Sequence, residues 1–169
     1  PELQAEEASR DVKLESEHAD QILKHLERFH YASREHLIIA ILWHTGIRIG
    51  TLRSFDLDDF SENNQYLRIR HRPDTETPLK NGRAAQRKIA LGSFYTEVIR
   101  EYIEVNRHSV TDDHGREPLI TSEYGRLTAS PIRRIVYQWT RPCMIASCPH
   151  DENPDTCEYM NRDKASGCP

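Results

Sequence analysis

Apolar residues recur at helical spacing in the first third of the chain. The range 16–29 has one apolar stripe, which predicts an amphipathic helix. The members of this stripe are Ile22, Leu23, Leu26 and Phe29. A second helix is expected from an N-cap at Ser33 through Trp43. Because this helix is apolar on most sides, we expect it to be central and Trp43 to lie in the core. Gly46 ends it, and a short helix is expected over 49–55.

The period of the pattern changes in the middle of the chain. Over 65–72, Leu67 and Ile69 point to one face and arginines to the other, as in a half-buried strand. A long turn over 73–82 contains two prolines and an Asn-Gly pair, and a partner strand is expected over 85–91. These features predict a β-hairpin.

Helical spacing returns after the hairpin. Ser93 is the expected N-cap of a helix, and a short strand is expected at 119–120. Ser130 followed by Pro131 predicts the N-cap and first position of a last helix, which ends near Trp139, a second expected core residue. The expected fold class is therefore α+β, mainly helical with a small antiparallel β-sheet.

Length and composition fit a soluble domain. The 169 residues are 37% hydrophobic and 30% charged, enough apolar material for one core. No apolar run approaches the ~20 residues that span a bilayer, and the first residues lack the basic and apolar pattern of a signal peptide. We therefore expect a cytoplasmic protein with no membrane partner. The chain opens without Met, so we expect a segment of a longer protein.

The distribution of charge is more informative than the net charge of -4. The range 66–91 carries seven bases against two acids, and the range 124–150 carries four arginines and no acid. A protein that is acidic overall can still present such a basic face to phosphates, although a solvated hairpin and helix would also explain it. The expected DNA-binding residues are Arg68, Arg70, Arg72, Arg83, Arg87, Lys88, Arg133 and Arg134.

Several motifs resemble those of one family. The segment 42–52, Leu-Trp-His-Thr-Gly-Ile-Arg-Ile-Gly-Thr-Leu, resembles the first signature box of the tyrosine recombinases, the phage integrase family. The turn at 77–82 and the strand at 87–91 resemble the family's lysine-bearing hairpin, and 118–122 follows in family order. The resemblance covers 16–141 and implies the catalytic-domain fold of that family, with double-stranded DNA and other copies of the full-length recombinase as partners.

The resemblance also implies a mechanism. In the family a tyrosine attacks the scissile phosphate and forms a phosphotyrosyl link without metal or ATP. Arg48 would be the first of two catalytic arginines, because a guanidinium matches two non-bridging oxygens of the phosphate. Lys80 would be the hairpin lysine that protonates the leaving 5′ oxygen, with Lys88, Arg83 and Arg87 as alternatives for that role.

The chain departs from the family pattern in two ways. Thr51 stands where the family usually has a glutamate that orients the first arginine, so either Asp56, Asp58 or Asp59 takes that role or no residue does. The family's later His-x-x-Arg and its nucleophilic tyrosine have no match, since Tyr159 does not fit the position. We therefore expect a chain cut before the second arginine box: an inactive piece of a parent enzyme for DNA integration and recombination.

Four cysteines and a histidine cluster late in the chain. They are Cys143, Cys148, His150, Cys157 and Cys168. Thiolates and imidazole suit a structural zinc ion, while disulfides and free thiols are the alternatives. No cofactor is expected for catalysis. The expected organisation is a linker or frayed helix at 1–15, part of a recombinase catalytic domain at 16–141, and a Cys-rich tail at 142–169.

A second function remains open from the sequence. A non-catalytic DNA- or protein-binding module with a zinc-stapled tail would use the same basic face, and Arg48 would then be incidental.

Overall fold

A computed structural model describes residues 14–153 and 155–160 of the chain. Its α-helices are α1 (Ser16–Phe29), α2 (Arg34–Thr45), α3 (Ile49–Arg53), α4 (Gly92–Glu101) and α5 (Ala129–Trp139). Its strands are β1 (Phe60–Ser61), β2 (Tyr66–Ile69), β3 (Arg87–Ala90), β4 (Thr121–Ser122) and β5 (Gly125–Arg126). Short 3-10 helices lie at Leu57–Asp59, Pro73–Thr75, Gly82–Ala85, Pro142–Met144 and Glu158–Met160, and a π-helical turn at Tyr102–Asn106. The fold class is the predicted one.

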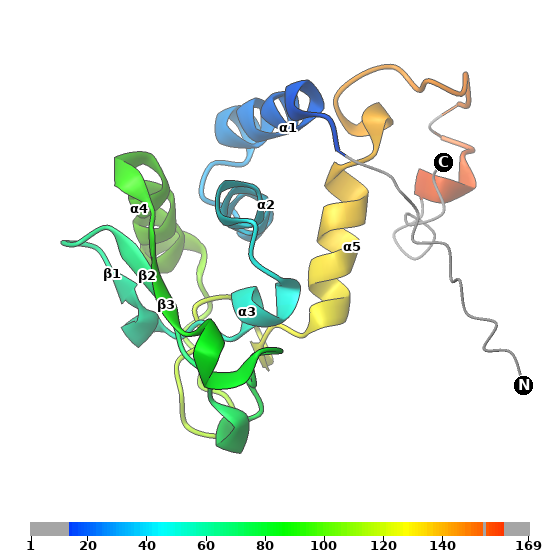
Figure 1. Ribbon diagram of the computed structural model, residues 1–169. Coiled ribbons are helices and arrows are strands. Elements are labelled where there is room, and N and C mark those ends of the chain that lie inside the picture. Colours follow the sequence, from blue (N-terminus) through cyan, green and yellow to red (C-terminus); the bar gives the residue numbers. More distant parts are fainter. Residues whose placement is uncertain (1–13, 154, 161–169) are drawn as a thin grey trace, which may run out of the picture.

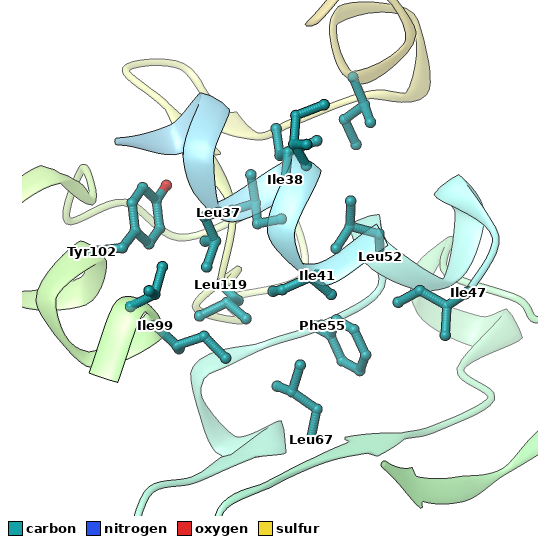
Figure 2. Packing of buried hydrophobic residues seen from close by; sticks show 14 of the residues in the cluster. Leu37, Ile38, Ile41, Ile47, Leu52, Phe55, Leu67, Ile99, Tyr102 and Leu119 are labelled. Carbon is teal, nitrogen blue, oxygen red and sulfur yellow. The ribbon is translucent and has the colours of Figure 1, made fainter. Parts of the chain in front are cut away.

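Helix α2 forms the centre of the molecule. Leu37, Ile38 and Ile41 on this helix are at most 1% exposed. They belong to one apolar cluster that contains residues of all five α-helices and of strand β2. Figure 1 shows α1 and α5 beside α2 on one side and α4 with the sheet on another. Figure 2 shows Leu52 and Phe55, from α3 and the turn after it, packed into the same cluster as Leu67 of the sheet. Burial on most sides of α2 is as predicted.

The main sheet has three antiparallel strands in the order β1-β2-β3. Strand β2 pairs with β3 in the register Leu67 to Ile89 and Arg68 to Lys88. Leu67 is fully buried, so this face of the sheet lies on the core, as the alternation predicted. Strand β1 is an addition that the sequence did not predict. Strands β4 and β5 form a separate two-stranded hairpin, two residues after the expected strand at 119–120.

The ends of α2 are held by two predicted devices. The Ser33 hydroxyl accepts a hydrogen bond from the His36 amide at 3.1 Å, which satisfies one of the free N–H groups of the first turn. Gly46 ends the helix at a φ of 61°, in the left-handed region where residues with a Cβ are strained. The chain therefore leaves α2 in a tight turn and enters α3 at once.

Several local expectations were wrong. Trp43 is 39% exposed: it lies in the last turn of α2, beyond the buried run at 36–41. Phe29, at the last position of α1, is 60% exposed, whereas Trp139 is 5% exposed as expected. Helices α4 and α5 begin two residues earlier than predicted, so their N-caps are not the expected serines. These N-caps are Leu91 and Thr128.

In the described part of the chain, no helix is both long and apolar enough to cross a bilayer.

Candidate functional site

Arg48 lies at the junction between α2 and α3. It is the N-cap residue of α3, and its carbonyl accepts hydrogen bonds from the Thr51 and Leu52 amides at 2.9 and 3.0 Å. Its neighbour Ile47 is 8% exposed and anchored in the apolar cluster. The Arg48 side chain is exposed and makes no hydrogen bond or ion pair with any residue that the structure describes. A fixed backbone thus presents an unpaired guanidinium to solvent.

Lys80 has a similar setting in the turn between β2 and β3. The preceding Leu79 is 6% exposed, belongs to the same apolar cluster as Ile47, and donates its amide to His71 Nδ1 at 3.0 Å. The Lys80 side chain is exposed. Arg48 and Lys80 are therefore each carried by a backbone segment that is anchored in one core.

The outer face of the β2–β3 pair is basic and carries an aromatic ring. Arg68 and Lys88 are direct cross-strand partners, so their side chains lie on the same face as Tyr66. Arg68 donates to the Tyr66 hydroxyl at 3.0 Å, and Lys88 lies 4.4 Å from the centre of that ring. The hydrogen bond from Arg68 lowers the pKa of Tyr66. Arg87, at the start of β3, is exposed at the free edge of the sheet.

Two of the expected DNA-binding arginines are bound to a carboxylate instead. Arg72 is 17% exposed at its side chain and contacts Asp59 at 2.8 Å. Arg70 is 35% exposed and contacts the same carboxylate at 3.2 Å. Arg72 is therefore turned inward, unlike the exposed Arg83 in the neighbouring turn.

Arg72 and Asp59 belong to a larger cluster of buried charged side chains. We call it the Arg–Asp cluster; its members are Asp56, Asp59, Asp112, Arg72, Arg116 and Arg126. The side chains of these residues are at most 17% exposed. They come from the turn after α3, the segment after β2, the loop before β4, and β5. Buried charges of this kind are stable only when they are paired and hydrogen-bonded, as these are.

Asp112 joins two arginines of the cluster. One of its carboxylate oxygens contacts Arg126 at 2.8 Å and Arg116 at 3.0 Å, and the other accepts the amides of His114 and Arg116, both at 3.0 Å. Burial acts to raise the pKa of Asp112, but these hydrogen bonds and the nearby Arg126 outweigh it and lower the pKa to about 2. The carboxylate is therefore charged at neutral pH.

The sequence analysis did not identify the cluster. Asp56 and Asp59 were two of the alternatives for orienting Arg48. Their partners are instead Arg72, Arg116 and Arg126, with Arg70 also on Asp59. Arg116 and Arg126 follow glycines in polar loops and look like ordinary surface residues in the sequence. We find no sequence signal that would have paired them with Asp56, which is at least 60 residues away.

The remaining predicted residues lie on α5 and in the tail. Arg133 and Arg134 are on exposed positions of α5, whose other side carries the buried Ile132 and Ile135. Figure 1 shows α5 beside α3, so its arginines come from an element next to Arg48's helix. Arg141, just after α5, is 4% exposed.

Arg141 connects the tail to the domain. Its guanidinium donates to the Tyr159 carbonyl, and Met144 and Ile145 pack against the apolar cluster. Cys143, Cys148 and Cys157 are half-buried free thiols, with Cys143 Sγ 3.7 Å from Met160 Sδ. Among residues 14–153 and 155–160, no group of three or more metal-ligating side chains is arranged to hold a metal ion. Cys168 lies outside the described residues.

A mainly helical α+β domain with small antiparallel sheets is the architecture of a tyrosine-recombinase catalytic domain. The model of the phage integrase family matches residues 13–150, and the chain belongs to this family.

The comparison with solved structures agrees with this assignment. The crystal structure of XerA recombinase matches with a TM-score of 0.60 and 18% sequence identity, over 85% of this chain. The two proteins therefore share the catalytic fold. The chain covers 46% of the length of XerA recombinase. A search of curated protein sequences found no match.

Proposed function

We propose that this chain is the DNA-binding first part of the catalytic domain of a site-specific recombinase. The complete enzyme would cut and rejoin double-stranded DNA through a phosphotyrosine intermediate, working with other copies of itself on the DNA. The nucleophilic tyrosine and the second arginine would come from residues beyond these 169, so this part alone would be inactive. Family membership, together with the unpaired Arg48 guanidinium on a fixed turn, carries the proposal.

Arg48 suits the stabilisation of a phosphoryl transition state. A pentavalent phosphorus centre gathers negative charge on its non-bridging oxygens, and a planar guanidinium can donate to two of them. An arginine already paired with a carboxylate would first have to exchange that partner. Arg48 has no such partner in the described residues, so its donors are available to a phosphate.

Lys80 suits the protonation of the leaving 5′ oxygen. An alkoxide is a poor leaving group, and an ammonium group near it supplies the proton as the P–O bond breaks. The exposed Lys80 follows Leu79, which is anchored in the same cluster as the residue before Arg48. The proposal requires Arg48 and Lys80 to reach the same scissile phosphate in the complex with DNA.

The basic face would bind the backbone of the duplex. Lys88 and Arg68 on the outer face of the sheet, Arg87 on its edge, and Arg83 in the turn are the proposed phosphate contacts. Arg133 and Arg134 on α5 would add to them. Such contacts release condensed cations from DNA, so the affinity should fall linearly with salt on a log–log plot.

The test is the salt dependence of DNA binding by this chain. Fluorescence anisotropy with a labelled mixed-sequence duplex, measured from about 50 to 200 mM salt, gives the slope, which is about 0.9 per phosphate contact. Arg48→Gln and Arg87→Gln should each reduce the slope by about one. Arg100→Gln is the matched control, because Arg100 on α4 is paired with Glu97, Glu101 and Glu104.

Each outcome decides between the alternatives. A reduced slope for Arg48→Gln with an unchanged slope for Arg100→Gln supports a phosphate contact by Arg48. A chain that does not bind duplex DNA contradicts the proposal. Binding in which Arg48→Gln has no effect, while Arg87→Gln does, would favour a binding module in which Arg48 takes no part.

A further inference from the structure

The Arg–Asp cluster lies at one end of α3 and Arg48 at the other. We propose that Asp112 and Arg126 are positioning residues for Arg48: they fix the C-terminal end of α3 and thereby the direction in which Arg48 presents its guanidinium. This inference rests on the proposed role of Arg48 in binding phosphate. It adds the loop before β4, far away in the sequence, to the machinery of the site.

Helix α3 needs external support. It has five residues, too few for a helix to be stable on its own hydrogen bonds. The last carbonyls of a helix have no partners within it, and cationic donors at this end also interact favourably with the helix dipole. The structure supplies such donors from the Arg–Asp cluster.

Three consecutive carbonyls at the end of α3 accept guanidinium donors. Arg126 Nη1 donates to the Arg53 carbonyl at 2.8 Å and to the Phe55 carbonyl at 3.2 Å. Arg72 donates to the Ser54 carbonyl between them at 3.3 Å. A guanidinium is planar and rigid, so these contacts fix both the position and the rotation of the end of α3.

The carboxylates hold the two guanidinium groups in turn. Arg126 Nε contacts Asp112 at 3.0 Å, its Nη2 contacts the same carboxylate and Asp56, and its side chain is 7% exposed. Arg72 is held by Asp59 at 2.8 Å. All three guanidinium nitrogens of Arg126 have an acceptor, and Arg72 bonds through both of its Nη atoms, so several contacts hold the end of α3 at once.

Arg48 has no comparable side-chain partner. Its guanidinium has no carboxylate among the described residues, so its direction depends on the backbone of its own turn. That backbone is fixed by Ile47 on one side and, through the hydrogen bond from the Leu52 amide, by α3 on the other. A shift at the far end of this short helix would therefore reach Arg48.

The experiment is a double-mutant cycle on DNA affinity in this chain. Asp112→Asn keeps an oxygen for the His114 and Arg116 amides but places an NH2 group against Arg126, which disrupts the guanidinium contacts. We expect it to weaken duplex binding by about threefold or more, and to have little effect when Arg48 is already replaced by Gln. Affinity is measured at a temperature below the unfolding transition of each variant, so every variant is folded in the assay. A loss of affinity then reports positioning rather than general destabilisation.

The matched control is Asp113→Asn. Asp113 is the adjacent, exposed carboxylate, so this variant loses the same charge without touching the cluster. Removing an acid should by itself strengthen DNA binding slightly. Asp112→Asn is therefore expected to weaken DNA binding, whereas Asp113→Asn is expected to strengthen it slightly. Only a positioning role of Asp112 predicts the weaker binding.

Two outcomes would overturn the inference. The first is that the Asp112→Asn variant binds DNA with the same affinity as the Asp113→Asn variant. The second is that Asp112→Asn weakens binding by the same factor in the wild-type chain and in the Arg48→Gln variant. If Asp112→Asn does not fold, Arg126→Lys replaces it in the cycle, because it keeps the charge and loses the two-carbonyl contact. A chain whose affinity does not depend on Arg48 at all would instead contradict the proposed function.

Discussion

His36 makes the stability of this domain dependent on pH in a way that can be calculated. The imidazole is 0% exposed on α2, and its Nδ1 accepts the Ala32 amide at 3.1 Å. Because Nδ1 is an acceptor, the proton of the neutral ring lies on Nε2, which has no partner among the residues that the structure describes. Burial disfavours the charged ring and lowers the pKa of His36 to about 4.

The sign of the effect follows from linkage. In the unfolded chain His36 titrates near its ordinary value of about 6.5, so between pH 6.5 and 4 the unfolded state binds a proton that the folded state does not. The contribution of the neutral His36 to the free energy of unfolding is therefore fully present above the pKa of the unfolded chain, about 6.5. It is lost as the pH falls towards the pKa of the folded protein, about 4. From pH 7.5 to 5 the loss from this one group is about 2 kcal/mol, at about 1.4 kcal/mol per pKa unit.

The variant His36→Asn isolates this contribution. Asparagine does not titrate, and its side-chain oxygen can accept the Ala32 amide in place of Nδ1. The free energy of unfolding, from urea titrations followed by circular dichroism, should be lower for the variant at pH 7.5 because of the cavity left by the ring. The difference between the two proteins should shrink by about 2 kcal/mol at pH 5. Parallel pH profiles would refute a buried, neutral His36.

Three further predictions concern the ends of α2 and the tail. Ser33→Ala should lower the free energy of unfolding by about 1 kcal/mol in the same urea assay, because the His36 amide loses its acceptor; an unchanged value would show that the cap does not stabilise the helix. Gly46→Ala should lower it by about 1 kcal/mol, although nothing lies within 4 Å of the added Cβ, because φ is 61°. If the tail binds structural zinc, elemental analysis of the purified chain should find about one zinc per chain, lost in Cys148→Ser and Cys157→Ser. Metal-free protein with unchanged stability after chelator treatment would contradict that hypothesis.

The parts of the fold that the sequence predicted depend on local patterns. Helix α1 has the predicted bounds, 16–29, and Ile22 and Leu26 of its apolar stripe are fully buried. The Ser33 cap and the Gly46 terminator are also local, since each acts on groups a few residues away. Strand β2 was found from alternation alone. By contrast, β1 is two residues long and therefore too short to show any alternation.

The Arg–Asp cluster could not be predicted for the same reason. Arg126 and Asp56 are 70 residues apart, and each lies in a polar stretch that is typical of a surface loop. Only the assembled fold brings the loop before β4 against the end of α3. Arg72 illustrates the same limit, because the alternation of β2 placed it on the solvent side, whereas Asp59 and Asp56 draw it inward.

Arg48 and Lys80 were suggested by family motifs, and the structure adds the setting of each residue. The sequence alone gave no information on whether either side chain would be buried or paired. Both are exposed, and the residue before each is held in the core. Their roles in catalysis remain the central proposal.

The most direct test uses the protein translated from the complete coding region that contains this chain. Covalent protein–DNA product is measured on a duplex with its recombination site, with either oxygen or sulfur at the 5′ bridging position of the scissile phosphate. A thiolate leaves without a proton, so Lys80→Gln should form little product with oxygen and recover with sulfur, while Arg48→Gln should remain defective with both. Lys80→Gln with no preference for sulfur, or Arg48→Gln with normal activity, would contradict the account.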